Sequence, residues 1–283
     1  MRKISTLMVS VLCMMMPVGA EAQVPTAFVS KGATDIQAQP HSVTQTNSGA
    51  QWAPIDPMVR SITMDDGLPS NAVRSVVQGS KGYMWFGTDN GLCRFDGYDV
   101  KTYYNPFTTV DQFVSALTAC EEGLLVGCNN GAYLFCNATD RFQKLSDKIT
   151  APVLNFSLDG DQNVWISTNG QGVFRYNRTT HELHQYPMKN IQGKVKSTLV
   201  DANNQVWMLC NHGEASIYHL NKSTDQFEAF PLKGDATMFH GMAMLATPDG
   251  NVYVGTWENG LYKLNADGSA EQLISCLLYT SPS

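Results

Sequence analysis

Charged residues are scarce in this 283-residue chain. They make up 16% of it, with 19 Lys and Arg against 25 Asp and Glu. The formal net charge of -6 leaves no basic surface for a phosphate backbone, so nucleic acid is not an expected partner. Beyond the first 22 residues the sequence also lacks any apolar run of the roughly 18 to 20 residues that span a bilayer.

Signatures of common catalytic and metal sites are missing as well. No GxSxG, HExxH, P-loop or CxxC pattern occurs. His181 and His184 have HxxH spacing without a nearby third ligand. Asp159, Asp161 and Asn163 begin like a calcium loop, but its twelfth position is glycine instead of glutamate. We therefore expect no metal, no cofactor and no catalytic residue here, although scattered carboxylates leave catalysis open.

The N-terminus has the features of an export signal. Arg2 and Lys3 precede an apolar run from Leu7 to Val18, and the small-residue site Ala20-Glu21-Ala22 follows. We expect residues 1–22 to be a signal peptide and residues 23–57, which are polar and without apolar periodicity, to be a flexible leader.

Cysteine usage indicates neither zinc nor redox chemistry, because the spacing of the six cysteines after the signal is irregular. Most of them are expected to be small apolar strand residues, and one or two disulfides remain open outside the cytoplasm. The six are Cys93, Cys120, Cys128, Cys136, Cys210 and Cys276.

One pattern recurs five times between residues 58 and 275. Short runs rich in Val, Ile, Trp, Tyr and Phe alternate with Asp-Gly or Asn-Gly signals, which are hairpin turns and would break a helix. The spacing of equivalent positions is 40, 40, 42 and 46 residues, a period typical of propeller blades. The equivalent positions are Trp85, Leu125, Trp165, Trp207 and Tyr253.

Each repeat predicts one four-stranded antiparallel blade. In the first, we expect an outer-facing first strand at Ala72–Val77, a second strand containing Trp85, a third at Gly91–Phe95 and a fourth at Lys101–Tyr104. The sequence therefore predicts an all-β chain, a β-propeller with about five blades in an incomplete ring. The recurring tryptophan is expected to pack between blades instead of holding a ligand.

Polar residues gather in the turns between second and third strands, which should all emerge on one face of the propeller. Amides and carboxylates beside an exposed aromatic suit an oligosaccharide, although Asn, Asp and Gly also simply suit hairpin turns. Turn chemistry explains Trp257 least, so it is the foremost contact candidate. The ligand-binding candidates are Trp257, Glu258, Asn259, Asp89, Asn90, Asn129, Asn169 and Asn211, with Asn130, Gln171 and His212 in the same turns.

The first repeat resembles the opening blade of the two-component-regulator propellers. The resemblance rests on the segments Gly67–Val73 (GLPSNAV) and Gly82–Tyr98 (GYMWFGTDNGLCRFDGY) and weakens in later repeats. It implies the periplasmic sensor region of a Bacteroidetes-type hybrid two-component system. In such a protein a transmembrane helix follows downstream and anchors the protein in the inner membrane. A histidine kinase comes after the helix, and the full-length protein is a homodimer.

The resemblance further implies that the chain detects glycan fragments and controls transcription of polysaccharide-utilisation genes. The chain itself is then no enzyme, although its parent is a histidine kinase. Two alternatives stay open: a secreted propeller lyase or glycosidase, and a protein-binding propeller. Residues 276–283 depart from the repeat, and no structural role is expected for them.

Overall fold

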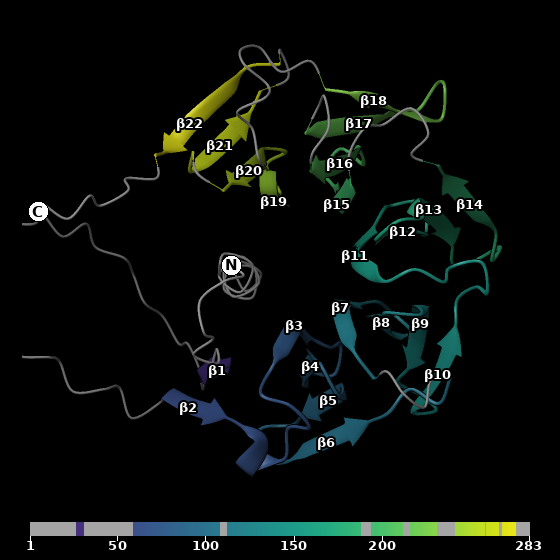
Figure 1. The fold of residues 1–283 in the computed structure, drawn as a ribbon, viewed down its shortest axis with the longest axis vertical. Coiled ribbons are helices and arrows are strands. Elements are labelled where there is room, and N and C mark those ends of the chain that lie inside the picture. The colour runs from purple at the N-terminus through teal and green to yellow at the C-terminus, as the bar shows by residue number, and fades with distance from the viewer. Residues whose placement is uncertain are drawn as a thin grey trace, which may run out of the picture.

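Five four-stranded antiparallel sheets make up most of the described chain in the computed structural model (Figure 1). The structure describes residues 27–30, 59–107, 112–187, 194–211, 216–230, 241–257, 259–265 and 268–275. Each sheet is one blade, its strands follow one another along the chain, and the expected all-β propeller fold is confirmed.

The blades contain the following strands. Blade 1 has β3 (Val73–Gln78), β4 (Met84–Thr88), β5 (Gly91–Phe95) and β6 (Val100–Tyr103); blade 2 has β7 (Val114–Ala119), β8 (Gly123–Cys128), β9 (Gly131–Cys136) and β10 (Arg141–Lys144); blade 3 has β11 (Val153–Leu158), β12 (Asn163–Thr168), β13 (Gly172–Asn177) and β14 (Leu183–Tyr186); blade 4 has β15 (Lys194–Val200), β16 (Val206–Asn211), β17 (Ile217–Asn221) and β18 (Gln226–Ala229); blade 5 has β19 (Gly241–Ala246), β20 (Val252–Thr256), β21 (Leu261–Leu264) and β22 (Ala270–Ile274).

The first strand of each blade lies at the centre of the molecule, not on the outside. Figure 1 shows β3, β7, β11, β15 and β19 around the middle and β6, β10, β14, β18 and β22 at the rim. Successive inner strands contact one another from β3 to β19. The expectation of an outer-facing first strand was wrong because its apolar pattern reports burial but does not distinguish the centre from the rim.

Residues outside the blades are partly described. The strand β1 (Ala27–Ser30) pairs antiparallel with β2 (Val59–Ile62), so the structure places four residues of the expected leader in a sheet. A short 3-10 helix (Met64–Asp66) then leads into blade 1. The expected signal peptide (1–22) and the final residues 276–283 lie outside the described residues.

The middle strands of the blades are the most buried. All six residues of β8 are buried, whereas outer strands such as β10 and β18 are largely exposed or half-buried. In blades 2 to 4 a middle strand is covered on both faces by neighbouring blades, so it has no solvent side on which polar residues could alternate. This explains the apolar runs at the centre of these repeats.

The repeated tryptophan packs between blades, as expected. Trp85 in blade 1 is 2% exposed, and it packs with Val114, Leu124 and Phe135 of blade 2. Its ring centroid lies 5.2 Å from that of Phe135 in an edge-on arrangement. Such aromatic pairs add stability beyond the burial of their area.

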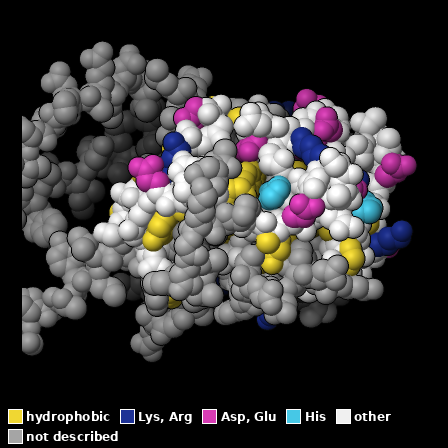
Figure 2. Space-filling view, turned by 90° about the horizontal axis from the view of Figure 1, so that it is seen from above, with side chains coloured by type: hydrophobic (Ala, Val, Ile, Leu, Met, Phe, Trp, Pro, Cys, Tyr) yellow, Lys and Arg dark blue, Asp and Glu magenta, His cyan; other side chains and the backbone are white. Residues whose placement is uncertain are grey.

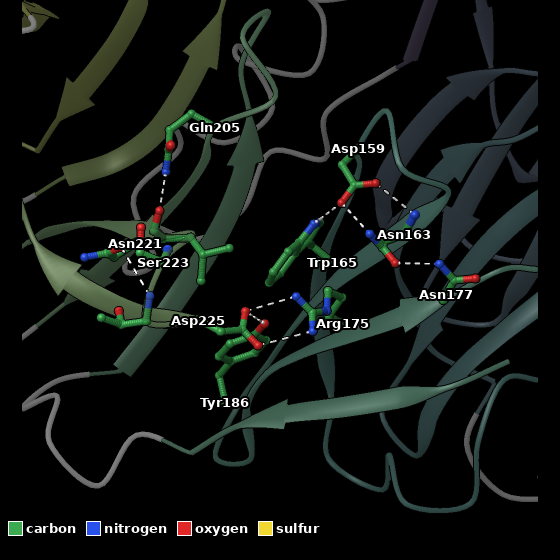
Figure 3. Close-up of polar contacts among 12 residues, drawn as sticks. Asp159, Asn163, Trp165, Arg175, Asn177, Tyr186, Gln205, Asn221, Ser223 and Asp225 are labelled. Carbon is green, nitrogen blue, oxygen red and sulfur yellow. Dashed lines mark hydrogen bonds and ion pairs between the residues drawn. The ribbon is translucent and has the colours of Figure 1, made fainter. Parts of the chain in front are cut away.

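A polar contact accompanies the tryptophan across two of the blade interfaces. Between blades 3 and 4, the Tyr186 hydroxyl donates to Asp225 Oδ1 at 2.7 Å, and the Arg175 guanidinium pairs with both oxygens of that carboxylate (Figure 3). The Tyr186 ring also lies beside Trp165, with centroids 5.4 Å apart. The Asp residue has a positive φ of 51°, so the turn that presents it adopts the left-handed conformation.

The same contact recurs between blades 1 and 2. Tyr103 donates to Asp140 Oδ2 at 3.3 Å, and Lys101 Nζ lies 3.1 Å from the same oxygen. Tyr103 also lies beside Trp85 at 5.7 Å, and Asp140 again has a positive φ. Blade 2, which has Leu125 in place of tryptophan, is joined to blade 3 instead by an ion pair between Glu122 and Arg178. The tyrosine and the aspartate thus accompany a tryptophan at two interfaces, and an ion pair alone occurs where the tryptophan is missing.

Glycines let successive blades approach closely. A Cβ on Gly87 would lie 2.7 Å from Val114 Cγ1 of the next inner strand, and one on Gly127 would lie 2.8 Å from Val153 Cγ1. At the interface of blades 4 and 5 the large residue, Leu209, belongs to the second strand and the small one to the next inner strand. There Gly241 belongs to the inner strand, and its Cβ would lie 2.5 Å from Leu209 Cδ1. One small and one large residue share the space in each case.

The five described cysteines are free thiols. Four of them are buried, and burial raises the pKa of Cys93 and of Cys210 to about 12. These two thiols therefore stay protonated at neutral pH. They are unreactive in this form, because the nucleophile is the thiolate. The expectation of small apolar strand residues is met by Cys93, Cys128 and Cys210.

The reversed pair between blades 4 and 5 can be tested by a double-mutant cycle. We expect Gly241→Val to lower the free energy of unfolding by about 1–3 kcal/mol, because the new side chain overpacks against Leu209. Combining it with Leu209→Ala should recover part of that loss. The double variant has a small residue on the second strand and valine on the next inner strand, as at Gly127 and Val153. Thermal or urea unfolding measures both values. Strict additivity of the two changes would contradict the assignment.

The Asp225 contact should make stability depend on pH. Burial opposes ionisation, but Tyr186 and Arg175 outweigh it and hold the pKa of Asp225 below its ordinary value. A lowered pKa contributes stability above the unfolded value of about 3.9, and this contribution disappears as pH falls through the folded value. Asp225→Asn should therefore lower the thermal midpoint at pH 7, but not well below pH 4.

The size of that effect should be about 1 kcal/mol or less, because the carboxylate is 43% exposed and water screens the ion pair. Asp147→Asn is the matched control, since the Asp147 side chain is 97% exposed and pairs only with nearby Lys144 among the described residues. Equal changes in the two variants across the pH series would refute the inter-blade role of Asp225.

Candidate ligand-binding face

The turns between second and third strands lie on one face of the propeller, together with the connections between blades. In blade 1 the turn after β4 pairs Thr88 with Gly91, and Gly91 lies against the backbone of Tyr103 at the end of β6. The chain then continues to blade 2 from this same end. Because every blade has the same strand order, we call this side of the molecule the turn face.

An irregularity in each inner strand marks the turn face. The register between the first and second strands shifts by one residue near this end of every blade, as in a β-bulge. Bulges redirect side chains at the ends of sheets. The bulge residues are Arg74, Ser115, Leu154, Lys196 and Met242, in order of blade.

Five of the candidate residues share one equivalent position on this face. Each directly follows the second-strand residue that is aligned just before the bulge, such as Thr88 with Val73 or Cys210 with Val195. In blade 4 the pairing continues one residue further, so Asn211 lies opposite Lys194. The five are Asp89, Asn129, Asn169, Asn211 and Trp257. Each blade thus presents one bulge residue and one turn residue at the turn face.

Asp89 is engaged within the protein. The Arg74 guanidinium pairs with both of its oxygens, at 2.6 Å from Nε and 2.9 Å from Nη2, and lies over the ring of Phe113. A carboxylate held by a bidentate arginine is less available to a ligand hydroxyl. Its role in the structure is to neutralise the bulge residue of its own blade.

The amide candidates differ in exposure. Asn90 and Asn169 are exposed, whereas Asn129, Asn211 and Asn259 are half-buried. They come from five blades, so they share a face without forming one cluster.

Trp257 is half exposed, at 50% of its surface, although it is a large apolar side chain. It follows β20 directly and lies at the end of blade 5 on the turn face. Glu258 and His212 lie outside the described residues.

Two further exposed aromatics on the turn face were missed in the sequence. Tyr104 and Phe107, in the connection from blade 1 to blade 2, are 57% and 53% exposed. The Phe107 ring stacks on Tyr133 with centroids 5.6 Å apart, and the Tyr133 hydroxyl donates to Asn130 Oδ1. The available signal was the aromatic run that continues past the end of the fourth strand.

Other polar side chains of this face hold the backbone. Gln171 Oε1 accepts hydrogen bonds from the amides of Thr150 and Ala151, at 2.9 and 2.7 Å, and fixes the connection from blade 2 to blade 3. Asn130 supports Tyr133, as described above. The side chains of Gln171 and Asn130 therefore hold the turns and connections of the turn face in place.

The motifs that imitate metal sites have local structural partners. Asp159 accepts hydrogen bonds from the backbone of Asp161 and Asn163 and from Trp165 Nε1, at 2.8 Å, so it closes a turn and positions the tryptophan (Figure 3). His181 contacts the Tyr176 hydroxyl. Within the described ranges, no group of three or more His, Cys, Asp or Glu side chains is arranged to hold a metal ion.

Charges of both signs are dispersed over the surface. Figure 2, which views the molecule from above Figure 1, shows acidic, basic and histidine side chains interspersed on the described surface. Dispersed charge provides no extended basic stripe for a polyanion on this side. In the part of the chain that the structure describes, no helix is long and apolar enough to cross a bilayer.

Comparison with known proteins supports the repeat and the fold. Residues 67–90 match the family model of the two component regulator propeller, which confirms the resemblance seen in the first repeat. No curated protein matches the sequence.

The fold is similar to that of extracellular domains of two hybrid two-component systems from B. thetaiotaomicron. One has a TM-score of 0.61 at 20% identity, with 72% of this chain and 28% of that chain covered. The other has a TM-score of 0.64 at 18% identity, with 76% and 32% covered. The chain thus spans about a third of their length or less.

Enzymes with a similar fold also occur. Virginiamycin B lyase from Staphylococcus aureus matches with a TM-score of 0.62 at 15% identity, over 77% of this chain and 74% of that one. At these identities the likeness shows the fold alone, so function depends on the site.

Proposed function

We propose that this chain is the exported ligand-sensing part of a hybrid two-component sensor histidine kinase. In this proposal it binds glycan fragments outside the cytoplasm, and binding controls transcription of polysaccharide-utilisation genes through a kinase encoded downstream. The full-length protein is anchored in the inner membrane and acts as a homodimer. The extracellular sensor domains with a similar fold support this proposal.

The observation that carries the glycan assignment is the set of exposed aromatics on the turn face. Trp257, Tyr104 and Phe107 are each at least half exposed, whereas most large apolar side chains of the blades are buried. Sugar rings present a flat apolar face that stacks on aromatic rings, and their hydroxyls bond to amides such as Asn90 and Asn169. The turn face offers both kinds of group.

A secreted lyase or glycosidase is the second candidate function, supported by propeller enzymes of similar fold. Incubating the complete extracytoplasmic region with polysaccharides and measuring new reducing or unsaturated ends distinguishes the two. Binding without turnover supports the sensor, and steady release of shortened chains supports the enzyme. A protein-binding propeller becomes preferred if no glycan binds while a protein partner is captured.

Trp257 should contribute to glycan affinity. We expect Trp257→Ala to weaken binding at least about tenfold, which corresponds to about 1.4 kcal/mol, because a stacking surface is lost. Calorimetric titration of the extracytoplasmic region with a glycan that it binds measures the change.

Tyr98→Ala is the matched control. Tyr98 is 78% exposed and lies in the turn between β5 and β6, at the opposite end of the blade from the turn face. Its replacement should leave affinity unchanged. Equal losses in the two variants, or none with Trp257→Ala, would count against the turn face as the binding surface.

A further inference from the structure

The bulge residue and the turn residue of each blade form a pair of positions, and the blades differ in the charge of that pair. In blade 1 the pair is Arg74 and Asp89, and the two side chains neutralise each other in a bidentate ion pair. In blade 2 it is Ser115 and Asn129, which are uncharged. Blade 3 has an uncharged pair too.

Blade 4 keeps the cation but not the carboxylate. Lys196 occupies the bulge position of Arg74, and Asn211 stands where blade 1 has Asp89. Lys196 Nζ instead lies 2.9 Å from Met242 Sδ, a weak acceptor. Among the residues that the structure describes, no carboxylate lies within ion-pairing distance of Lys196.

The surroundings of Lys196 make its charge costly. The side chain is half-buried, and burial lowers the pKa of its ammonium group. A buried charge is unfavourable unless a partner of opposite charge or good hydrogen bonds compensate it. An anion from outside the chain would meet this need, because charge-assisted contacts are the strong ones.

The neighbouring blade adds a flat apolar surface. The inner strands β15 and β19 lie side by side at the centre of the molecule (Figure 1), which brings Met242 to Lys196. Gly241 pairs with Thr256, so Met242 and Trp257 each lie one residue from this pair at the same corner of blade 5. A cation and a thioether therefore meet at the junction of blades 4 and 5, and an exposed indole lies at the same end of blade 5.

We propose that Lys196, Met242 and Trp257 form a subsite for an acidic sugar. Lys196 binds the carboxylate of a uronic acid residue, while Trp257 and Met242 contact the apolar face of the sugar ring. The subsite deepens the proposed function, because it rests on the turn face binding a glycan. It names the ligand as a uronic-acid-containing oligosaccharide.

Paired probes test the charge of the ligand. Oligosaccharides containing galacturonic, glucuronic, mannuronic or guluronic acid are each compared with a carboxyl-reduced, neutral counterpart of the same length. Calorimetric titration is carried out on the complete extracytoplasmic region. We expect at least one acidic member to bind, and its neutral counterpart to bind at least about tenfold more weakly, the usual effect of one charge-assisted contact.

Variants assign the preference to Lys196. Lys196→Gln should remove the difference between acidic and neutral probes, and Lys196→Arg should retain it. Lys222→Gln removes an exposed lysine in the turn between β17 and β18, at the opposite end of blade 4, and should change neither affinity by more than about twofold, since exposed charges are screened. Thermal unfolding checks that each variant is folded.

A second variant leaves the lysine in place. Asn211→Asp places a carboxylate at the position of Asp89 and should neutralise the lysines beside it, Lys196 at the bulge and Lys194 opposite it in β15. We expect it to abolish the acidic preference while binding of the neutral probes persists. An acidic preference that survives both Lys196→Gln and Asn211→Asp would overturn the proposal.

The outcomes separate this inference from the proposed function. If neutral glycans bind on the turn face and acidic ones bind no better, the uronic acid subsite is refuted while the glycan sensor stands. If sulfated oligosaccharides bind through Lys196 and uronates do not, the carboxylate assignment is refuted as well. If neither acidic nor neutral glycans bind, both the subsite and the glycan sensor are refuted.

Discussion

The contact between neighbouring blades is the constraint on which the rest of the structure depends. A blade is a four-stranded sheet whose middle strands are apolar on both faces, so burial against a neighbouring blade stabilises it. Trp85 and Trp165 fill the interfaces, glycines such as Gly127 bring the next inner strand close, and Asp140 and Asp225 tie the outer strands together. Each of these features crosses from one blade to the next.

This constraint also explains where the candidate site lies. Side chains in the middle of a strand are used for packing, so variable polar and aromatic groups are confined to the ends of strands. At the turn face, the bulge residue and the turn residue of each blade lie at the end of the sheet, beyond the buried middle of the second strand. The framework of the blade can stay the same while this pair changes from Arg74 and Asp89 in blade 1 to Lys196 and Asn211 in blade 4.

Much of this could be predicted from the chain itself. Five equivalent aromatic or apolar positions at nearly constant spacing, with Asn-Gly turns between apolar runs, predict the blades and the burial of Trp165. The turn residues were also placed on a common face. The ion pair of Asp89 was not foreseen, because its partner Arg74 is fifteen residues away and reaches it only through a bulge. Tyr104 was expected inside the fourth strand, which ends one residue earlier, and Phe107 was missed because a connection has no periodic pattern.

The sequence by itself determined the repeat, the order of strands within a blade and the positions of the turns, because apolar alternation and turn chemistry act over a few residues. Only the tertiary structure decided that the first strand of each blade lines the centre, and that the sizes of Leu209 and Gly241 are reversed. It alone also decided that, among the described residues, Lys196 contacts Met242 of the next blade. These facts depend on contacts between blades, and residues some forty positions apart meet only when the blades pack.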